Sequence, residues 1–172
     1  MRRIAIIGNA GEGKSVLARK LGQVFDIPIY EFDNLQWQPG WTLAPAEDIT
    51  TIHKKWLSQS GWVIDGWGSW DILKERFNAA DTLIFVDYPL RVHYWWATKR
   101  HVKAILKRST DWPPDGCKAL PVTFRLVKMM WVTHKEIRPQ LTALIDRYIG
   151  EKQVIYLRSP HEMKRLMTDI NG

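Results

Sequence analysis

The sequence predicts an α/β fold for residues 1–172 as a single domain, with a parallel β-sheet and helices on both of its faces. Short apolar runs rich in β-branched residues alternate with longer helical segments, and a glycine-rich loop joins the first run to the first helix. Runs of this kind are typical of parallel strands buried on both faces. Five strands are expected, over residues 2–7, 26–33, 62–66, 82–87 and 153–157.

The helical segments between these runs are marked by the residues at their ends. Pro45 and the carboxylates of Glu47 and Asp48 suit a first helical turn, and Ser159 followed by Pro160 is a serine cap with proline at the first helical position. Helices are expected from residue 16, over residues 45–60, 72–78, 91–108 and 122–148 (with a bend near Pro139), and from residue 160.

A phosphate-binding loop follows the first predicted strand. Residues 8–15 read G-N-A-G-E-G-K-S, which fits G-x-x-x-x-G-K-[ST] at each fixed position. Its backbone N–H groups can curl around a phosphate, and the next helix adds partial positive charge at its N-terminus. The sequence therefore predicts a nucleoside triphosphate site, with Lys14 at the β- and γ-phosphates and the Ser15 hydroxyl on Mg²⁺. The residues expected to hold the nucleotide are Gly8, Asn9, Ala10, Gly11, Glu12, Gly13, Lys14, Ser15 and Val16.

Two aspartates, Asp65 and Asp87, end apolar runs and are candidates for the carboxylate that orders water around Mg²⁺. The short-range pattern does not separate them. We favour Asp65, because Gly66 and an aromatic loop open space after it, whereas Asp87 is followed by Tyr88 and Pro89, which lead into a helix. The aspartate that does not serve Mg²⁺ is expected to cap a turn.

Asp33 ends the second predicted run. Ligands of open α/β sheets lie at the carboxyl ends of the strands, so Asp33 is placed to position an acceptor and to accept the hydrogen of its hydroxyl group. The alternative is a structural role, in which Asp33 caps the turn into Asn34. We favour the catalytic role.

The net charge of +7 is concentrated between residues 88 and 138, where eleven Lys and Arg residues stand against three Asp and Glu residues. Arg100 and Arg108 precede a loop at residues 111–116 that contains two prolines and a glycine. Arginines beside such a loop are typical of a lid that closes on a transferring phosphoryl group. We therefore expect a small helical lid at residues 91–138, with catalytic roles for Arg100 and Arg108. The alternative is that this basic segment binds nucleic acid.

Tryptophan is frequent, with ten residues. Four tryptophans lie in loops after predicted strands, where they either wall an acceptor pocket or close the core: Trp37, Trp41, Trp67 and Trp70. Five others lie in predicted helices or strands and are expected in the core: Trp56, Trp62, Trp95, Trp96 and Trp131.

The sequence also predicts a cytoplasmic protein with no membrane partner. The first strand begins almost at Met1, which leaves no room for a signal peptide. No apolar run approaches the length of about 18 residues that a membrane span needs. Cys117 is the only cysteine, which excludes an intrachain disulfide and favours a reducing compartment.

The order of these parts resembles that of the adenylate-kinase-like P-loop kinases. The resemblance is carried by residues 8–15, Asp33, Val63-Ile64-Asp65-Gly66, Asp87 and the arginine-bordered lid. It implies a three-layer P-loop NTPase fold with core strands in the order 2-3-1-4-5, Asp65 on the Mg²⁺ waters, and Arg158 near the adenine-binding loop. Nucleoside-monophosphate kinases follow the Asp-Gly pair with an aromatic residue, a proline and an arginine that bind the acceptor, whereas this chain has Trp67-Gly68-Ser69.

Over nearly the whole chain, the sequence is also similar to the bacterial DNA topology modulation (FlaR-like) proteins. The matching residues are the loop, residues 29–33, 37–41, 62–66, Arg76, 87–89 and the basic stretch up to 113–117. The family name suggests an effect on DNA supercoiling, although the fold that it implies is that of a small-molecule kinase. The sequence contains no recognisable DNA-reading module.

Together these observations predict an ATP- and Mg²⁺-dependent phosphotransferase that acts on a small hydroxyl- or phosphate-bearing acceptor. The alternative is a nucleotide-binding protein whose basic face contacts DNA or RNA.

Overall fold

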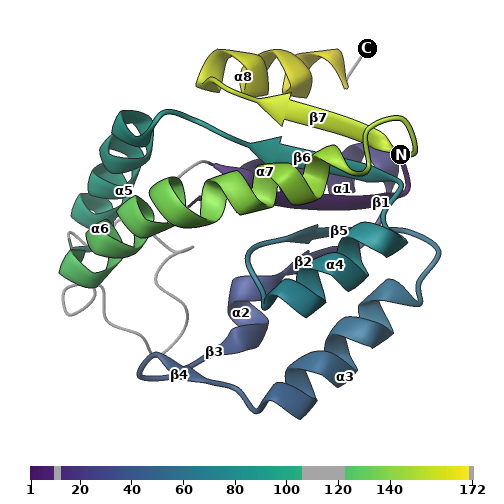
Figure 1. Ribbon diagram of the computed structural model, residues 1–172, viewed down its shortest axis with the longest axis horizontal. Helices are drawn as coiled ribbons and strands as arrows, with labels where there is room; N and C mark the ends of the chain where they lie inside the picture. Colours follow the sequence, from purple (N-terminus) through teal and green to yellow (C-terminus); the bar gives the residue numbers. More distant parts are fainter. Residues whose placement is uncertain (10–12, 106–122, 171–172) are drawn as a thin grey trace.

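A five-stranded parallel sheet forms the centre of the computed structural model, which describes residues 1–9, 13–105 and 123–170 (Figure 1). Its strands are β1 (Arg3–Gly8), β2 (Ile29–Glu31), β5 (Trp62–Asp65), β6 (Thr82–Val86) and β7 (Gln153–Leu157). They lie in the order β2-β5-β1-β6-β7. Counted along the chain as the five strands of this sheet, the order is 2-3-1-4-5, so both the α/β fold and the strand order predicted from sequence are confirmed.

Helices cover both faces of this sheet (Figure 1). Successive side chains of a strand point to opposite faces, so Ile4 and Ile6 of β1 contact one helical layer while Ala5 and Ile7 contact the other. The first layer contains α1 (Lys14–Phe25) and α8 (Pro160–Asp169), and the second contains α3 (Ala46–Leu57), α4 (Trp70–Ala79) and α7 (Arg138–Asp146). Burial of the strands on both faces explains why they are almost continuously apolar in sequence.

The second strand ends earlier than the sequence predicted. β2 stops at Glu31, and the buried Phe32 begins the short helix α2 (Phe32–Gln36). The expectation that Asp33 ends a strand is therefore wrong, since Asp33 lies in the first turn of α2. A carboxylate is favoured there because it interacts with the positive end of the helix dipole.

A small antiparallel hairpin lies where a loop was expected at residues 35–41. Its strands are β3 (Trp37–Gln38) and β4 (Thr42–Leu43). Gly40 and Trp41 both have positive φ, 80° and 63°, and the Trp41 N–H donates to the Gln38 carbonyl at 3.1 Å. This tight turn closes the hairpin. Strands of two residues are too short for an alternating hydrophobic pattern to indicate them in the sequence.

The basic segment forms helices on either side of residues 106–122. These helices are α5 (Leu90–Ile105) and α6 (Thr123–Val132), and α6 continues through the π-helical turn η2 (Thr133–Ile137) into α7. The π-helical turn ends at Ile137, two residues before Pro139, which cannot donate a backbone hydrogen bond. Arg108 and the loop at residues 111–116 lie outside the described residues.

Three tryptophans expected in the core are exposed instead. Trp62 is fully buried, but Trp95, Trp96 and Trp131 are 61%, 44% and 45% exposed. α5 and α6 contact each other, and their buried side chains include Ala97 and Met130. A tryptophan in a helix is buried only if it lies on the helix face that packs against another element. The sequence pattern did not identify that face for these helices.

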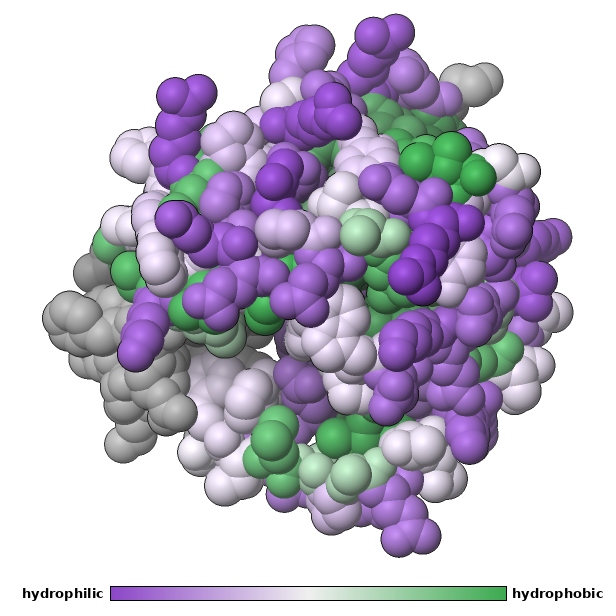
Figure 2. All heavy atoms as spheres, in the orientation of Figure 1, coloured by the Kyte–Doolittle hydropathy of each residue, from purple (hydrophilic) through white to green (hydrophobic). Residues whose placement is uncertain are grey.

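The surface seen in Figure 2 is mainly hydrophilic, with hydrophobic residues in small separate groups. Within residues 1–9, 13–105 and 123–170, none of the helices combines the length and the hydropathy of a membrane span.

Asp81 holds the start of β1 against the start of β6. Its Oδ2 accepts hydrogen bonds from the backbone N–H groups of Arg2 at 2.9 Å and Arg3 at 2.8 Å, and its Oδ1 accepts one from Thr82 Oγ1 at 2.7 Å. Partial burial raises the pKa of Asp81, but the hydrogen bonds from Thr82, Arg3 and Arg2 outweigh it, and the pKa lies below its ordinary value of 3.8. The carboxylate form therefore stabilises the folded state.

We expect Asp81→Asn to lower the free energy of unfolding by about 1 kcal/mol near neutral pH, because it weakens these hydrogen bonds. The pKa of the native carboxyl is lowered on folding, so its contribution is present above pH 3.8 and is lost as the pH falls through the folded value. Urea unfolding at pH 6 and at pH 3 should therefore show a difference between variant and wild type that shrinks at pH 3. Asp71→Asn, at a side chain that is 96% exposed, is the matched control. A difference that is the same at both pH values would contradict the role of Asp81.

Candidate functional site

The register of the central strands brings four chain segments to one edge of the sheet. Gly8 of β1 pairs with Val86 of β6, and Ile6 pairs with Asp65 of β5. Glu31 of β2 pairs with Asp65 on its other side. The carboxyl ends of these strands, the start of α1 and the start of α2 therefore surround one region, which is where open α/β sheets bind ligands.

The phosphate-binding loop begins at the end of β1 and leads into α1. Gly13 has φ 77°, a left-handed conformation suited to glycine, and α1 begins at Lys14. Lys14 Nζ donates a hydrogen bond of 2.5 Å to the carbonyl of Asn9. The first N–H groups of α1 have no partner within the helix, and such groups at a helix N-terminus can bind an anion. Ala10, Gly11 and Glu12 lie outside the described residues.

Val16 lies in the first turn of α1, directly after Ser15. Its side chain is 55% exposed, and its N–H donates to the Gly13 carbonyl at 3.1 Å within the first turn of α1.

Ser15 and Asp65 form a polar pair beside this loop. Ser15 Oγ donates to Asp65 Oδ2 at 2.7 Å, and Asp65 is only 4% exposed. Its other oxygen, Oδ1, is buried and has no hydrogen-bond partner among the described residues. A buried carboxylate oxygen without a partner is costly unless water or a cation approaches it. Hydroxyl and carboxylate oxygens are ligands that suit Mg²⁺ and its waters, so the pair fits such a site.

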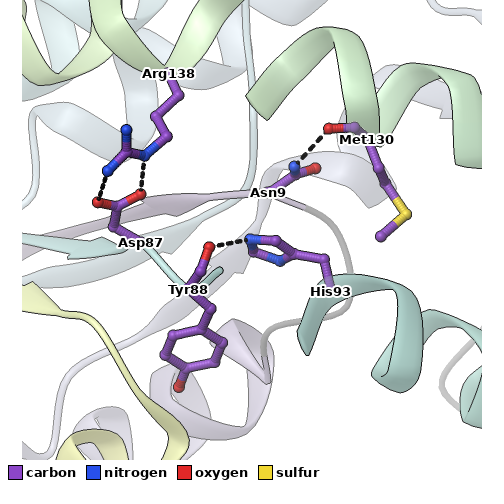
Figure 3. Close-up of polar contacts among 6 residues, drawn as sticks. All are labelled: Asn9, Asp87, Tyr88, His93, Met130 and Arg138. Carbon is purple, nitrogen blue, oxygen red and sulfur yellow. Dashed lines mark hydrogen bonds and ion pairs between the residues drawn. The ribbon is translucent and has the colours of Figure 1, made fainter. Parts of the chain in front are cut away.

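Asp87 is engaged differently. Both of its oxygens accept hydrogen bonds from Arg138 of α7, from Nε at 2.5 Å and from Nη2 at 2.7 Å (Figure 3). The hydrogen bond with Asp87 raises the pKa of Arg138, although burial acts in the opposite direction. The two aspartates that the sequence did not separate therefore have different partners. The role of Arg138 was not predicted from the sequence. The feature that marks this residue in the sequence is its position directly before Pro139.

A hydrogen bond joins the phosphate-binding loop to α6 of the basic segment. Asn9, which is buried, donates from Nδ2 to the Met130 carbonyl of α6 at 2.9 Å (Figure 3). In the same region His93 of α5 bonds the Tyr88 carbonyl at 2.8 Å. His134 helps to line a small cavity in this region. Burial and the charge of Arg138 lower the pKa of His134. The other residues lining that cavity include Gly8, Asn9, Trp67, Asp87, His93 and Arg138.

Asp33 lies beside Gly66, the residue after Asp65, although it belongs to a helix. Gly66 has φ 110°, and a Cβ placed on it would lie 3.2 Å from Asp33 Oδ1 and 3.2 Å from the Phe32 Cβ. Only glycine allows this close approach of α2 to the end of β5. The exposed Asp33 side chain therefore borders the same edge as Ser15 and Asp65.

The predicted arginines lie on different elements. Arg158 follows β7 and is exposed, with its guanidinium carbon 5.7 Å from the centre of the Tyr156 ring. Its backbone N–H donates to Glu162 Oε2 at 2.7 Å at the start of α8. Arg100 lies in α5, and the structure does not describe Arg108.

A fully buried arginine lies under the Asp33 side of this region. Arg76 of α4 donates from Nη1 to the Gly66 carbonyl at 2.7 Å. Its Nε lies 3.5 Å from Nε2 of the buried His53. Burial and the Arg76 charge lower the pKa of His53 to about 4, so the imidazole is neutral at pH 7. The helical spacing of Arg76 with the apolar Leu73 and Phe77 was the sequence signal for its burial.

The four loop tryptophans form two edge-to-face pairs. Trp37 packs on Trp41 across the hairpin, and Trp67 packs on Trp70, each pair with ring centres 5.6 Å apart. Trp67 and Trp70 also pack against the core layer under α4 and α7, which supports the packing alternative for this pair.

No protein-family model matches the chain, and no curated protein matches it either. Many solved structures are similar to it, and two of them cover 99% of its length. One is a gluconokinase from Sinorhizobium meliloti 1021, with a TM-score of 0.51, 14% identity and 95% of that chain covered. The other is a shikimate kinase from Acinetobacter baumannii in complex with shikimate, with a TM-score of 0.61, 11% identity and 91% of that chain covered. The chain therefore has the α/β fold of these two kinases.

The Asp87–Arg138 pair should stabilise the attachment of α7 to the sheet edge. We expect a double-mutant cycle of Asp87→Asn and Arg138→Met to give a coupling free energy of about 1 kcal/mol, allowing for screening at the half-exposed arginine. Urea unfolding measures it. The matched control is the exposed pair Arg165–Asp169 of α8, with side chains 76% and 64% exposed, whose coupling should be no more than about 0.5 kcal/mol. Equal coupling in the two pairs would contradict a structural role for Asp87.

Proposed function

We propose that the protein is an ATP-dependent phosphotransferase that moves the γ-phosphoryl group of ATP to a small hydroxyl- or phosphate-bearing acceptor. The observation that carries the proposal is the pair formed by Ser15 and the buried Asp65, beside Lys14 and the start of α1. The fold shared with a gluconokinase and a shikimate kinase supports the same class of reaction.

The nucleotide half of the site would use the loop and α1. Backbone N–H groups from Gly8 to Ser15 would surround the β- and γ-phosphates, and Lys14 would place its charge on the developing negative charge. Ser15 and Asp65 would hold Mg²⁺, with Asp65 acting through water. Bound there, the metal would neutralise charge on the phosphate oxygens.

The acceptor half would use Asp33. The acceptor oxygen would form a bond to the γ-phosphorus while the bond from phosphorus to the β,γ-bridging oxygen breaks, which leaves ADP. The hydroxyl proton would pass to the Asp33 carboxylate. Arg100 and Arg108 of a lid at residues 91–138 would stabilise the transferring group, and Arg158 would lie near the adenine.

The acceptor is proposed as a small hydroxyl-bearing molecule first and a phosphate second. Trp67-Gly68-Ser69 stands where nucleoside-monophosphate kinases have an acceptor-binding arginine, and Trp67 packs on Trp70. The bound shikimate of one structural neighbour is a small hydroxylated compound, which supports this order. The relation to the adenylate kinases and to the FlaR-like proteins, and the cytoplasmic location, stay predictions.

The test is ADP release from ATP in the presence of Mg²⁺, across a panel of sugar acids, polyols, nucleosides and nucleotides. We expect one acceptor class to accelerate release, and Lys14→Ala to reduce turnover at least about 100-fold while leaving the fold intact, because it removes a charge that stabilises the transition state. Circular dichroism checks the fold, and Lys20→Ala on the same helix is the control. Normal turnover in the Lys14 variant would exclude the assignment. A flat panel with confirmed ATP binding would count against the kinase proposal.

One observation favours a second function, the binding of single-stranded nucleic acid by the basic segment. Trp95 and Trp96 of α5 are exposed, and Lys99 Nζ lies 5.0 Å and 5.7 Å from their ring centres. On α6 and η2, Lys135 Nζ lies 5.6 Å from the ring of the exposed Trp131. Exposed aromatic rings beside cations can stack bases and neutralise phosphates.

For this function we expect an oligothymidine to quench tryptophan fluorescence saturably, with an affinity that falls steeply with salt because each neutralised phosphate releases counterions. The double variant Trp95→Ala, Trp96→Ala should bind at least about tenfold more weakly, since each lost stacking contact costs about 1–3 kcal/mol. Lys54→Ala on α3 is the control. Absence of saturable binding at physiological salt would exclude this function.

A further inference from the structure

The buried Arg76 has no role in the proposed reaction so far, and its surroundings are unusual for a charged side chain. It is 0% exposed, at the centre of the layer formed by α3, α4 and the end of β5. Taking a guanidinium out of water costs several kcal/mol unless close partners compensate. Among the described residues, no carboxylate lies within ion-pair distance of Arg76, and Nη2 has no hydrogen-bond partner. Burial of the Arg76 guanidinium with so few partners is therefore expected to cost free energy of folding rather than to stabilise the core.

The groups that Arg76 does contact belong to the two segments that carry the site's carboxylates. Nη1 donates to the carbonyl of Gly66, the residue after Asp65. The guanidinium carbon lies 4.7 Å from the centre of the Phe32 ring, and Phe32 directly precedes Asp33. One planar side chain therefore fixes the end of β5 and the start of α2 at the same time.

The charge of Arg76 also acts on this region. Burial lowers the pKa of Arg76 to about 10, and the nearby charges of Asp65 and Asp33 act in the opposite direction. The guanidinium is thus protonated at neutral pH, and its field reaches both carboxylates.

His53 contacts the guanidinium of Arg76 on the side away from Gly66, and Glu75 lies near the other nitrogen of the His53 ring. Because an arginine can only donate, His53 Nε2 must be the acceptor of the 3.5 Å contact with Arg76 Nε, which leaves the imidazole proton on Nδ1. Nδ1 lies 3.4 Å from the Glu75 carboxylate. His53 also packs edge-on against Phe32, with ring centres 5.8 Å apart. The orientation of Arg76 is therefore set by groups that do not themselves reach the site.

We propose that Arg76 is a positioning residue that sets the spacing between Asp33 and Asp65, and so the placement of the acceptor relative to the nucleotide. The proposal rests on the proposed phosphotransferase function. No contact joins Arg76 to the described part of the phosphate-binding loop or to α1, so its loss should impair transfer more than nucleotide binding.

The first readout is kinetic and uses the acceptor found in the panel. Arg76→Met keeps the length of the side chain but removes its charge and donors, and we expect kcat to fall about 100-fold, because small misplacements of reacting groups cost that much. KM for ATP should change less than about twofold, because the contacts that bind ATP equally in the ground state and in the transition state do not involve Arg76. Arg76→Lys keeps the charge but not the planar fork, and kcat should fall about tenfold. Lys74→Met, at an exposed site of α4, should behave as wild type.

A second readout does not depend on knowing the acceptor. Hydrogen–deuterium exchange of the full chain, with and without Mg²⁺ and ADP, should show faster exchange in Arg76→Met at residues 32–36 and 66–69 and no change in β1 or β6. If Arg76→Met does not fold, the same comparison is made with Arg76→Lys.

Two results would overturn the proposal. One is a kcat within about twofold of wild type in both Arg76 variants, since a positioning residue must change the transfer step. The other is an exchange result that is not local: either faster hydrogen–deuterium exchange throughout the sheet, or no change at residues 32–36 and 66–69. Either outcome would mean that Arg76 affects only the stability of the fold. If the acceptor panel is flat for the wild-type protein, the proposed function fails, and the exchange result alone decides whether Arg76 fixes these two segments.

Discussion

The parallel register of β1 between β5 and β6 is the constraint on which the rest of the site depends. It aligns Gly8 with Val86 and Ile6 with Asp65, so the phosphate-binding loop, Asp65 and Asp87 emerge together at one edge. A shift of one residue would turn every side chain of β1 to the opposite face and would bury the wrong set. The fully buried, two-sided core of β1 thus fixes both the fold and the position of the loop.

The buried polar groups at this edge have distinct partners, and these partners separate their roles. Asp87 forms two hydrogen bonds with Arg138 and thereby joins α7 to β6, while Asp65 has one oxygen on Ser15 and the other unpaired among the described residues. A carboxylate whose two oxygens both accept from a guanidinium has less capacity left for a metal and its waters. One with an unpaired buried oxygen has that capacity. This contrast supports the proposal that Asp65 serves Mg²⁺.

The loop is connected to the basic segment as well as to the sheet. Asn9 donates to the Met130 carbonyl, so the start of the phosphate-binding loop and helix α6 are in direct contact. Together with the Asp87–Arg138 pair, this places α6 and α7 against the edge where the nucleotide is proposed to bind. On the other side of Asp65, Arg76 ties the end of β5 to the start of α2. The two halves of the proposed site are thus held by separate sets of contacts.

The sequence by itself determined the five strands of the sheet and the start of α8, because these depend on residue spacing and short-range chemistry. Ser159, for example, caps α8 as its sequence indicates. Only the tertiary structure decided the partners of Asp65 and Asp87, since Ser15 and Arg138 lie 50 and 51 residues away from them along the chain. It also decided that Asp33 lies in the first turn of a helix, that Arg76 is fully buried, and that Trp95 and Trp96 are exposed. Local periodicity encodes which residues share a face, but the element that covers this face is chosen by packing between distant segments.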